Sequence, residues 1–310
     1  MSLLEVVNLK KKYSDAEVVK GISFKVEEGE ILGFLGPNGA GKSTTINILS
    51  TALKSTNGQI KFMDKDILKN KREYKGKLGI VPQSLAIFEN LPAIENVKYF
   101  ACFYGLKGEE LIKKCEEALD MVGLLDRAKD LPKTYSGGMK RRLNIACALA
   151  HSPKLLILDE PTVGIDPQSR NHILESIKKL RDRGTTVIYT THYMEEVEAI
   201  CDRALIIDKG QIIAEGTLES LKSSLEESTI YNISADGIED IDKEEIKSIK
   251  GVSRVEFKDG LRVSTLKESN NLDKIILKLI ANKVQIKNIV TEEQNLETIF
   301  LNLTGRTLRD

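Results

Sequence analysis

The chain of 310 residues has no tryptophan, only three histidines and only four cysteines. The cysteines lie far apart with no C-x-x-C pair, which argues against a disulfide framework or a cysteine metal site and indicates reduced thiols. Every apolar run falls short of the ~18 residues that span a bilayer, and the N-terminal residues lack a signal-peptide pattern. We therefore expect a cytoplasmic protein that reaches a membrane only through a partner.

Neither sign of charge is in excess. Lys plus Arg and Asp plus Glu each number 46, and 41% of the residues are hydrophobic, as in ordinary globular proteins. Chains that bind nucleic acid usually carry a basic excess, so we predict no nucleic-acid partner.

Residues 1–222 alternate strand-like and helix-like segments, which predicts an α/β fold with helices on the faces of a sheet. A short apolar strand at Glu30–Leu35 runs into a glycine-rich loop, and a helix is predicted over Ser43–Leu53. From about residue 84 to 134 the pattern is nearly all helical, which predicts a helical insertion. Other predicted strands are Leu3–Leu9, Ile22–Val26, Leu155–Leu158 and Thr186–Tyr189.

Residues 229–310 predict a separate accessory α+β domain. From Leu221 onward there are 14 Lys/Arg against 16 Asp/Glu, so this part is not a basic arm. Two predicted strands, Val252–Phe257 and Leu261–Thr265, flank an Asp259-Gly260 hairpin signal. The order βαββαβ predicts a ferredoxin-like module. Its other elements are strands Thr229–Ile233 and Val284–Val290 and helices Lys243–Ile249, Asn271–Asn282 and Leu296–Leu303.

The most specific motif is GPNGAGKS, Gly36 to Ser43, which fits G-x-x-x-x-G-K-[ST] between a predicted strand and a predicted helix. Its glycines let backbone N–H groups turn toward phosphate oxygens, and the following helix presents its positive N-terminal end. Lys42 would reach the β- and γ-phosphates, and the Ser43 hydroxyl would ligate Mg²⁺. We therefore predict ATP and Mg²⁺ as ligands. The predicted nucleotide contacts in this P-loop are Gly36, Asn38, Gly39, Gly41, Lys42, Ser43 and Thr44.

An apolar strand that ends in two carboxylates gives the second chemical signal. In LLILDE, residues 155–160, Asp159 would hold Mg²⁺ directly or through water, and Glu160 would polarise the attacking water. An acidic strand end is also a common solvated turn, so this interpretation depends on the P-loop.

The third motif is YSGGMKRRL, Tyr135 to Leu143, before a helix predicted over Arg142–Ala150. Ser-Gly-Gly at a helix start is another phosphate-binding nest, although it also occurs in ordinary loops. The P-loop, S-G-G-x-K/R-R and L-I-L-D-E-P in this order resemble the P-loop NTPase domain of ATP-binding-cassette (ABC) transporters, over about residues 3–222. YSGGMKRR and the stretch Asn295–Leu301 are similar to exporters of the antibiotic-resistance type.

The resemblance implies roles for further residues. Tyr13 lies about where these ATPases stack an aromatic ring on adenine. Gln83 matches the glutamine loop that contacts Mg²⁺, and Asp166 matches the loop that crosses to the other protomer. His192 matches the switch histidine that contacts the γ-phosphate. The signature residues that would bind the nucleotide held by the other protomer are Ser136, Gly137 and Gly138.

Two signature positions depart from many family members. Tyr135 stands where leucine is common, and we expect only a difference in packing. Met139 stands where glutamine is common, which removes an amide that could bond to the nucleotide across the dimer.

The resemblance also implies partners. The chain has one copy of each motif, so it is expected to form a homodimer, or a heterodimer with another ATPase subunit. ATP hydrolysis would power a separate integral membrane permease at the inner face of the cell membrane, docked in the groove beside Gln83. Export is favoured because the predicted tail differs from the all-β regulatory domain of sugar importers.

Other functions fit less well. A soluble ABC ATPase that acts on ribosomes or DNA usually carries two cassettes or a long coiled coil, and this sequence shows neither pattern. An importer ATPase remains an alternative. A P-loop GTPase needs Asn-Lys-x-Asp, which Asn70-Lys71-Arg72-Glu73 matches only in part and too near the P-loop. A kinase leaves Ser-Gly-Gly before the acidic strand end unexplained.

Overall fold

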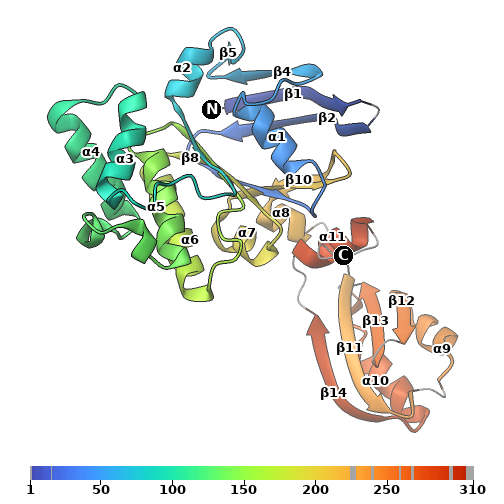
Figure 1. The fold of residues 1–310 in the computed structure, drawn as a ribbon. Coiled ribbons are helices and arrows are strands. Elements are labelled where there is room, and N and C mark those ends of the chain that lie inside the picture. Colours follow the sequence, from blue (N-terminus) through green and yellow to red (C-terminus); the bar gives the residue numbers. More distant parts are fainter. Residues whose placement is uncertain are drawn as a thin grey trace. The chain divides into compact units, whose positions relative to one another are not determined.

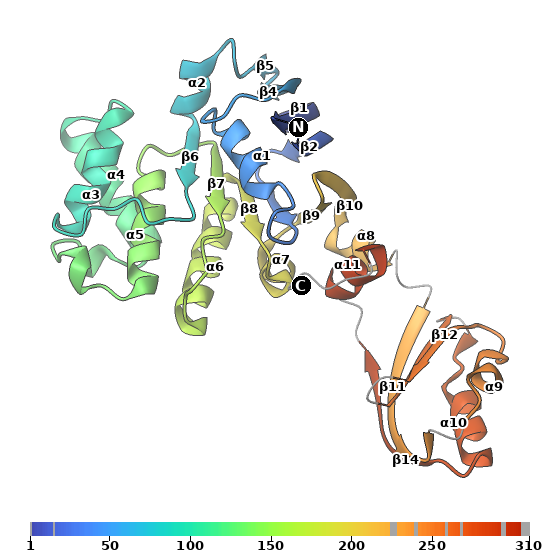
Figure 2. The same ribbon diagram turned by 45° about the vertical axis from the view of Figure 1, so that its right-hand side comes forward.

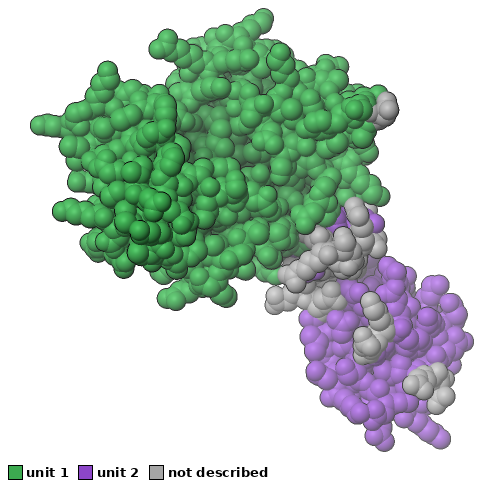
Figure 3. Space-filling model, viewed as in Figure 1, with its two compact units in different colours: residues 1–218, 306–310 green, residues 219–305 purple. Residues whose placement is uncertain are grey.

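The computed structural model describes residues 2–14, 16–223, 228–238, 241–257, 260–266, 269–292 and 296–304. These residues divide into two compact units, residues 2–218 and residues 219–304, which Figure 3 shows in green and purple. The first unit contains two sheets with their helices, and the second contains one sheet with its helices.

The larger sheet of the first unit has the strand order β10-β9-β3-β8-β7-β6. All neighbouring pairs are parallel except β9 and β10. Every residue of β3 and β8 is buried, as expected for central strands of a parallel sheet with both faces covered. The strands are β3 (Ile31–Leu35), β6 (Leu78–Val81), β7 (Leu155–Asp159), β8 (Thr186–Thr191), β9 (Arg203–Asp208) and β10 (Gln211–Thr217).

The second sheet of this unit is antiparallel, with the order β2-β1-β4-β5. Its strands are β1 (Ser2–Tyr13), β2 (Ala16–Glu27), β4 (Asn57–Phe62) and β5 (Lys65–Asp66). The first two strands form a longer hairpin than the sequence predicted, because the pairing continues beyond the apolar residues to Tyr13 and Ala16. Phe24 from this sheet contacts Phe34 from the larger sheet, so the two sheets share one apolar core.

The helices of the first unit cover the sheets and form a helical layer, in which α3, α4 and α5 pack against one another (Figures 1 and 2). The helices are α1 (Lys42–Leu49), α2 (Lys71–Gly76), α3 (Ala93–Phe103), α4 (Gly108–Met121), α5 (Gly137–Leu149), α6 (Pro167–Asp182) and α7 (Met194–Ile200), with 3-10 turns at Leu125–Arg127 and Pro132–Thr134. Helix α8 (Leu218–Ser223) starts the second unit, because its residues after Leu218 belong to that unit. Among all described residues, no helix is both long and apolar enough to cross a membrane.

Helix α5 begins at Gly137 and not at Arg142, where the sequence predicted it. Glycine pairs are poor helix formers, but the Ser136 hydroxyl accepts a hydrogen bond from the Met139 N–H at 3.2 Å and so caps the helix. Tertiary packing also requires a small residue here, since a Cβ on Gly138 would lie 2.2 Å from Oγ of Ser169.

The second unit is a sheet of order β12-β13-β11-β14 with antiparallel neighbours. This order and the βαββαβ sequence of elements confirm the predicted ferredoxin-like module. Gly260 of the hairpin signal has φ +134°, while Asp259 and Asn295 lie outside the described residues. The elements are β11 (Ser228–Asp236), α9 (Lys243–Lys247), β12 (Val252–Phe257), β13 (Leu261–Leu266), α10 (Leu272–Ala281), β14 (Gln285–Glu292) and α11 (Leu296–Thr304).

Candidate active site

The P-loop connects β3 to α1, and its backbone conformation requires glycine. A Cβ on Gly36 would lie 2.3 Å from the carbonyl oxygen of Ile207. Gly41, just before α1, has φ +104°, a conformation that favours glycine. Asn38, Gly39 and Ser43 are exposed, and Thr44 is half-buried. The loop therefore offers backbone donors, a hydroxyl and the start of a helix to an anion.

Lys42 is a buried cation in this loop, with only 4% of the residue exposed. Its Nζ donates hydrogen bonds to the carbonyl oxygens of Gly36 at 2.7 Å and Pro37 at 3.2 Å. The same nitrogen lies 3.4 Å from Oε1 of Glu160. Burial lowers the pKa of Lys42, and the Glu160 carboxylate opposes that effect. A buried ammonium with one carboxylate partner is suited to binding a polyphosphate.

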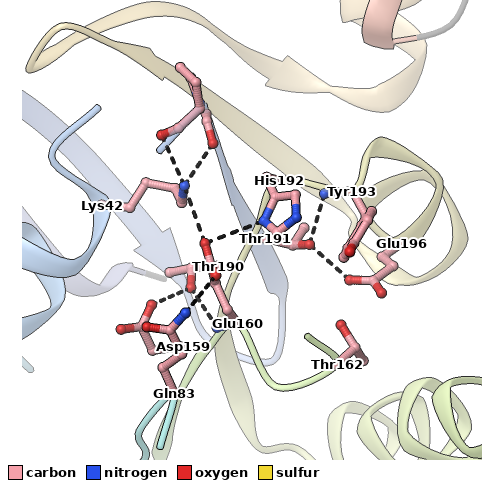
Figure 4. A network of polar contacts seen from close by, with 12 residues as sticks. Lys42, Gln83, Asp159, Glu160, Thr162, Thr190, Thr191, His192, Tyr193 and Glu196 are labelled. Carbon is pink, nitrogen blue, oxygen red and sulfur yellow. Dashed lines mark hydrogen bonds and ion pairs between the residues drawn. The ribbon is translucent and has the colours of Figure 1, made fainter. Parts of the chain in front are cut away.

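Glu160 follows β7 and is 6% exposed. Its φ is +46°, a conformation that is uncommon for residues other than glycine and is found at functional sites. Its Oε2 accepts a hydrogen bond from Nε2 of Gln83 at 3.0 Å, and its Oε1 lies 3.5 Å from Nδ1 of His192. Figure 4 shows the side chains of Lys42, Gln83 and His192 converging on this carboxylate.

Thr190 joins both acidic residues, a role that the sequence interpretation missed. Its hydroxyl donates to Oδ1 of Asp159 at 2.6 Å and accepts from the Glu160 N–H at 2.9 Å. The parallel register of β7 and β8 places Asp159 directly beside Thr190. The available signal was the pair of threonines that ends the strand VIYTT, just before His192.

The oxygen donors that the sequence predicts as Mg²⁺ ligands suit this ion better than a softer metal. They are the Asp159 carboxylate, the exposed Ser43 hydroxyl and the Gln83 amide oxygen, all hard ligands. The described part of the chain holds no group of three or more His, Cys, Asp or Glu side chains that could bind a metal ion alone. Mg²⁺ is commonly held by one or two carboxylates together with substrate phosphates, which is consistent with this donor set.

Helix α5 fixes the loop that carries Gln83. The guanidinium of Arg141 is buried and donates to the carbonyl oxygens of Pro82 at 3.2 Å and Gln83 at 2.8 Å. Oδ1 of Asn144 accepts from the Ala86 N–H at 3.1 Å. Arg141 lies within the YSGGMKRRL motif, but nothing in the sequence pattern shows that it reaches back to this loop.

The signature and the Asp166 loop form a second group. Ser136 and Gly137 are exposed at the start of α5, and Asp166 caps α6 by accepting from the Ser169 N–H at 2.9 Å. Hydrogen bonds from the backbone and the side chain of Ser169 lower the pKa of Asp166. Gly138 packs on the same Ser169. Both ribbon views show α5 and α1 apart, so the structure does not bring the signature to the P-loop of its own chain (Figures 1 and 2).

Two tyrosines noted in the sequence lie in different environments. Tyr13, at the end of β1, is 45% exposed, and Nζ of Lys11 lies 4.9 Å from its ring centre. Tyr135 is 6% exposed, and its hydroxyl donates to the carbonyl oxygen of Arg127 at 2.6 Å. Tyr135 is therefore a packing residue, whereas Tyr13 presents a ring to solvent.

The fold and the convergence on Glu160 define a P-loop ATPase. Comparison with known proteins identifies the family. Residues 19–163 match the family described as ABC transporter. The linearmycin resistance ATP-binding protein LnrL of Bacillus subtilis is 47% identical over 99% of this chain and 100% of its own length. The daunorubicin/doxorubicin resistance ATP-binding protein DrrA of Streptomyces peucetius is 34% identical over 99% and 94%. A Nod factor export ATP-binding protein I of Cupriavidus metallidurans is 33% identical over 100% and 99%.

Solved structures agree. The post-hydrolysis dimer of the cassette MJ0796 with ADP and Pi is 29% identical, with a TM-score of 0.63 over 69% of this chain and 98% of that one. CbiO1 of Clostridium perfringens, part of the complex cbiONQ, is 30% identical, with a TM-score of 0.67 over 72% and 92%. The chain belongs to the ABC transporter family and resembles the ATP-binding proteins of its antibiotic-resistance subgroup. It is an ATP-binding subunit whose family couples ATP hydrolysis to transport with membrane components.

Proposed function

We propose that this chain is the Mg²⁺-dependent ATPase subunit of an exporter and acts at the inner face of the membrane through a separate permease. The observation that carries the ATPase assignment is the contact between buried Lys42 and Glu160 at the carboxyl edge of the parallel sheet. Export is supported by relatives whose names refer to drug resistance and to Nod factor export.

The P-loop residues Gly36, Asn38, Gly39, Gly41, Lys42, Ser43 and Thr44 bind the phosphates in this proposal. Backbone donors and the α1 N-terminus are fixed dipoles, so they stabilise negative charge without reorganising. Lys42 exchanges part of its contact with backbone carbonyls for phosphate oxygens. Tyr13 stacks on adenine, which its exposed ring permits.

Ser43, Asp159 and Gln83 hold Mg²⁺ in this proposal. When bound, Mg²⁺ neutralises charge on the phosphates. The Thr190 hydroxyl orients the Asp159 carboxylate toward a ligand by occupying one of its oxygens.

Glu160 and His192 carry the reaction in this proposal. Glu160 accepts the proton of the attacking water, because it is a carboxylate held in place by its backbone bonds to Thr190. Gln83 orients Glu160 by donating to Oε2. His192 contacts the γ-phosphate through its imidazole, which lies within 3.5 Å of Glu160.

Two copies of the chain, or this chain and another ATPase subunit, complete each site. The support is that Ser136, Gly137, Gly138 and Asp166 lie at the starts of α5 and α6, and that both ribbon views show α5 apart from α1, the helix that follows the P-loop (Figures 1 and 2). A head-to-tail pair would bring the exposed start of α5 to the phosphates of the other chain and add a second helix N-terminus. The second domain, residues 229–310, takes no part in chemistry in this proposal and tunes or pairs the dimer. We propose no role in nucleic-acid binding.

Nucleotide titration of Lys42→Ala tests the assignment. Loss of a charge-assisted contact should weaken ATP binding about tenfold to hundredfold. The exposed lysine variant Lys69→Ala is the matched control and should bind like the wild type. Chelation of Mg²⁺ should abolish hydrolysis by the wild type, and added Mg²⁺ should restore it. Unchanged affinity in Lys42→Ala, or full turnover in the chelator, would refute the proposal.

A further inference from the structure

The segment around His192 is fixed on both sides of the histidine. Before it, Thr191 is 1% exposed at the end of β8. After it, the Tyr193 N–H donates to Oγ1 of Thr191 at 2.9 Å. The direction of the imidazole therefore depends on where the Thr191 hydroxyl is held.

Glu196 holds that hydroxyl. It lies in the first turn of α7, is 2% exposed, and accepts at Oε2 from the hydroxyls of Thr191 at 2.9 Å and Tyr189 at 2.8 Å. Burial raises the pKa of Tyr189, so its hydroxyl remains a donor. Figure 4 shows Thr191 and Glu196 beside the His192 ring, on the side away from Glu160. A buried carboxylate is costly unless it is paired.

The charge partner of Glu196 comes from another helix. Nε of Arg170, on α6, lies 3.4 Å from Oε1 of Glu196, and the guanidinium carbon lies 4.9 Å from the Tyr193 ring centre. Neither Nε nor Oε1 has a hydrogen-bond partner within the described part of the chain, so the two atoms meet as charges only. Arg170 thus contacts Tyr193, which follows His192. It also contacts the Glu196 carboxylate, which holds Thr191, the residue before His192.

The first turn of α6 also meets the signature. Asp166 caps this turn, and Ser169 packs against Gly138. Arg170 follows immediately. A shift of this turn would therefore be transmitted through Arg170 to the segment that carries His192, because α6 and α7 pack directly against each other.

We infer that Arg170 and Glu196 are positioning residues for His192, and that they link its placement to the α6 turn beside the signature. This inference rests on the proposed function of His192. In the proposed dimer, Ser136 to Gly138 and Asp166 face the second chain. The Arg170–Glu196 pair then makes the imidazole of one chain sensitive to contact with the other.

Single-turnover hydrolysis and ATP titration of Arg170→Gln and Glu196→Gln test this inference. Glutamine at position 196 keeps an acceptor for the two hydroxyls but removes the charge. Each variant should bind ATP like the wild type and hydrolyse it about tenfold to hundredfold more slowly, since small misplacement of a reacting group has effects of this size. The exposed α6 variant Glu175→Gln is the control and should match the wild type.

The decisive comparison uses a His192→Ala background. If Arg170 and Glu196 act through His192, neither substitution should slow hydrolysis further there. The inference would be overturned if either substitution slowed hydrolysis in the His192→Ala background as much as in the wild type. It would also be overturned if ATP affinity fell as much as the hydrolysis rate. Arg170 has a side chain that is 30% exposed, so its variant should fold even if Glu196→Gln does not. Wild-type turnover in His192→Ala alone would instead refute the proposed role of the histidine.

Discussion

The two units of this chain bury polar groups in different ways. In the first, buried charged residues include Lys42, Glu160, Arg141 and Glu196. Among the described residues of the second, the buried polar side chains are Thr265 and Asn271, and they hydrogen-bond to each other at 2.7 Å.

This difference indicates that the chemistry takes place in the first unit. A buried charge destabilises a fold unless it is paired, so natural proteins keep such groups mainly where function needs them. In the first unit, the buried Lys42, Arg141, Glu160 and Glu196 lie in or next to the contacts around Glu160 and His192, whereas the buried Glu30 pairs with Arg203 and supports the fold. In the second unit the Asn271–Thr265 pair also bonds to backbone carbonyls of Lys250 and Gly251, which makes it a structural link within an apolar core.

The largest expected difference between the two units is in their response to a cavity in the core of the second unit, which should lower stability without affecting ATP binding. Leu279 is fully buried on α10, so Leu279→Ala should destabilise the second unit by about 2–5 kcal/mol. ATP affinity should stay within twofold of the wild type. Leu277→Ala, on the same helix and 66% exposed, is the control and should change little. Denaturant unfolding and ATP titration measure both quantities, and a parallel loss of affinity would break the comparison.

A smaller, pH-dependent effect is expected in the first unit alone, which contains all three histidines. His151 stacks on Tyr104 with ring centres 3.5 Å apart, and burial lowers the pKa of His151 to about 4. The unfolded chain then binds the proton more readily than the folded one. The neutral form of His151 therefore contributes to the free energy of unfolding of the first unit. This contribution is fully present above pH about 6.5, is lost as the pH falls toward 4, and amounts to at most about 3 kcal/mol.

Unfolding of the first unit by urea at pH 7 and pH 4.5 checks this. His151→Gln should lose less stability between the two pH values than the wild type does. His172→Gln, with an exposed ring, should behave like the wild type. Equal pH dependence in all three proteins would show that His151 is not the titrating group.

The smallest effect is expected from removing the second unit. A chain that ends at Leu218 should bind ATP with near-native affinity, because the described contacts around Lys42 and Glu160 come from residues before that position. Dimer stability and transport should fall if the second domain pairs or tunes the dimer. Isothermal titration of the shortened chain decides this. A folded chain without nucleotide binding would mean that the tail belongs to the site.

Local motifs made much of the site predictable. Lys42, Asp159, Glu160 and His192 each lie at or after the end of a short apolar strand, and parallel strands bring these ends to one edge of the sheet. Thr190, Arg141 and Glu196 were missed because their roles depend on partners thirty or more residues away or on burial that spacing does not reveal. Similarly, the start of α5 depends on Ser169, and the antiparallel sheet depends on pairing between β1 and β4.

The central claim is that two chains complete each ATP site around Glu160. Measuring the molar mass of Glu160→Gln by light scattering, with and without Mg²⁺ and ATP, tests it most directly. Loss of the base should slow hydrolysis about 10²–10⁴-fold while leaving ATP bound between the chains. We predict a dimer with ATP and a monomer without it. A monomer in both conditions, or wild-type turnover in this variant, would contradict the account.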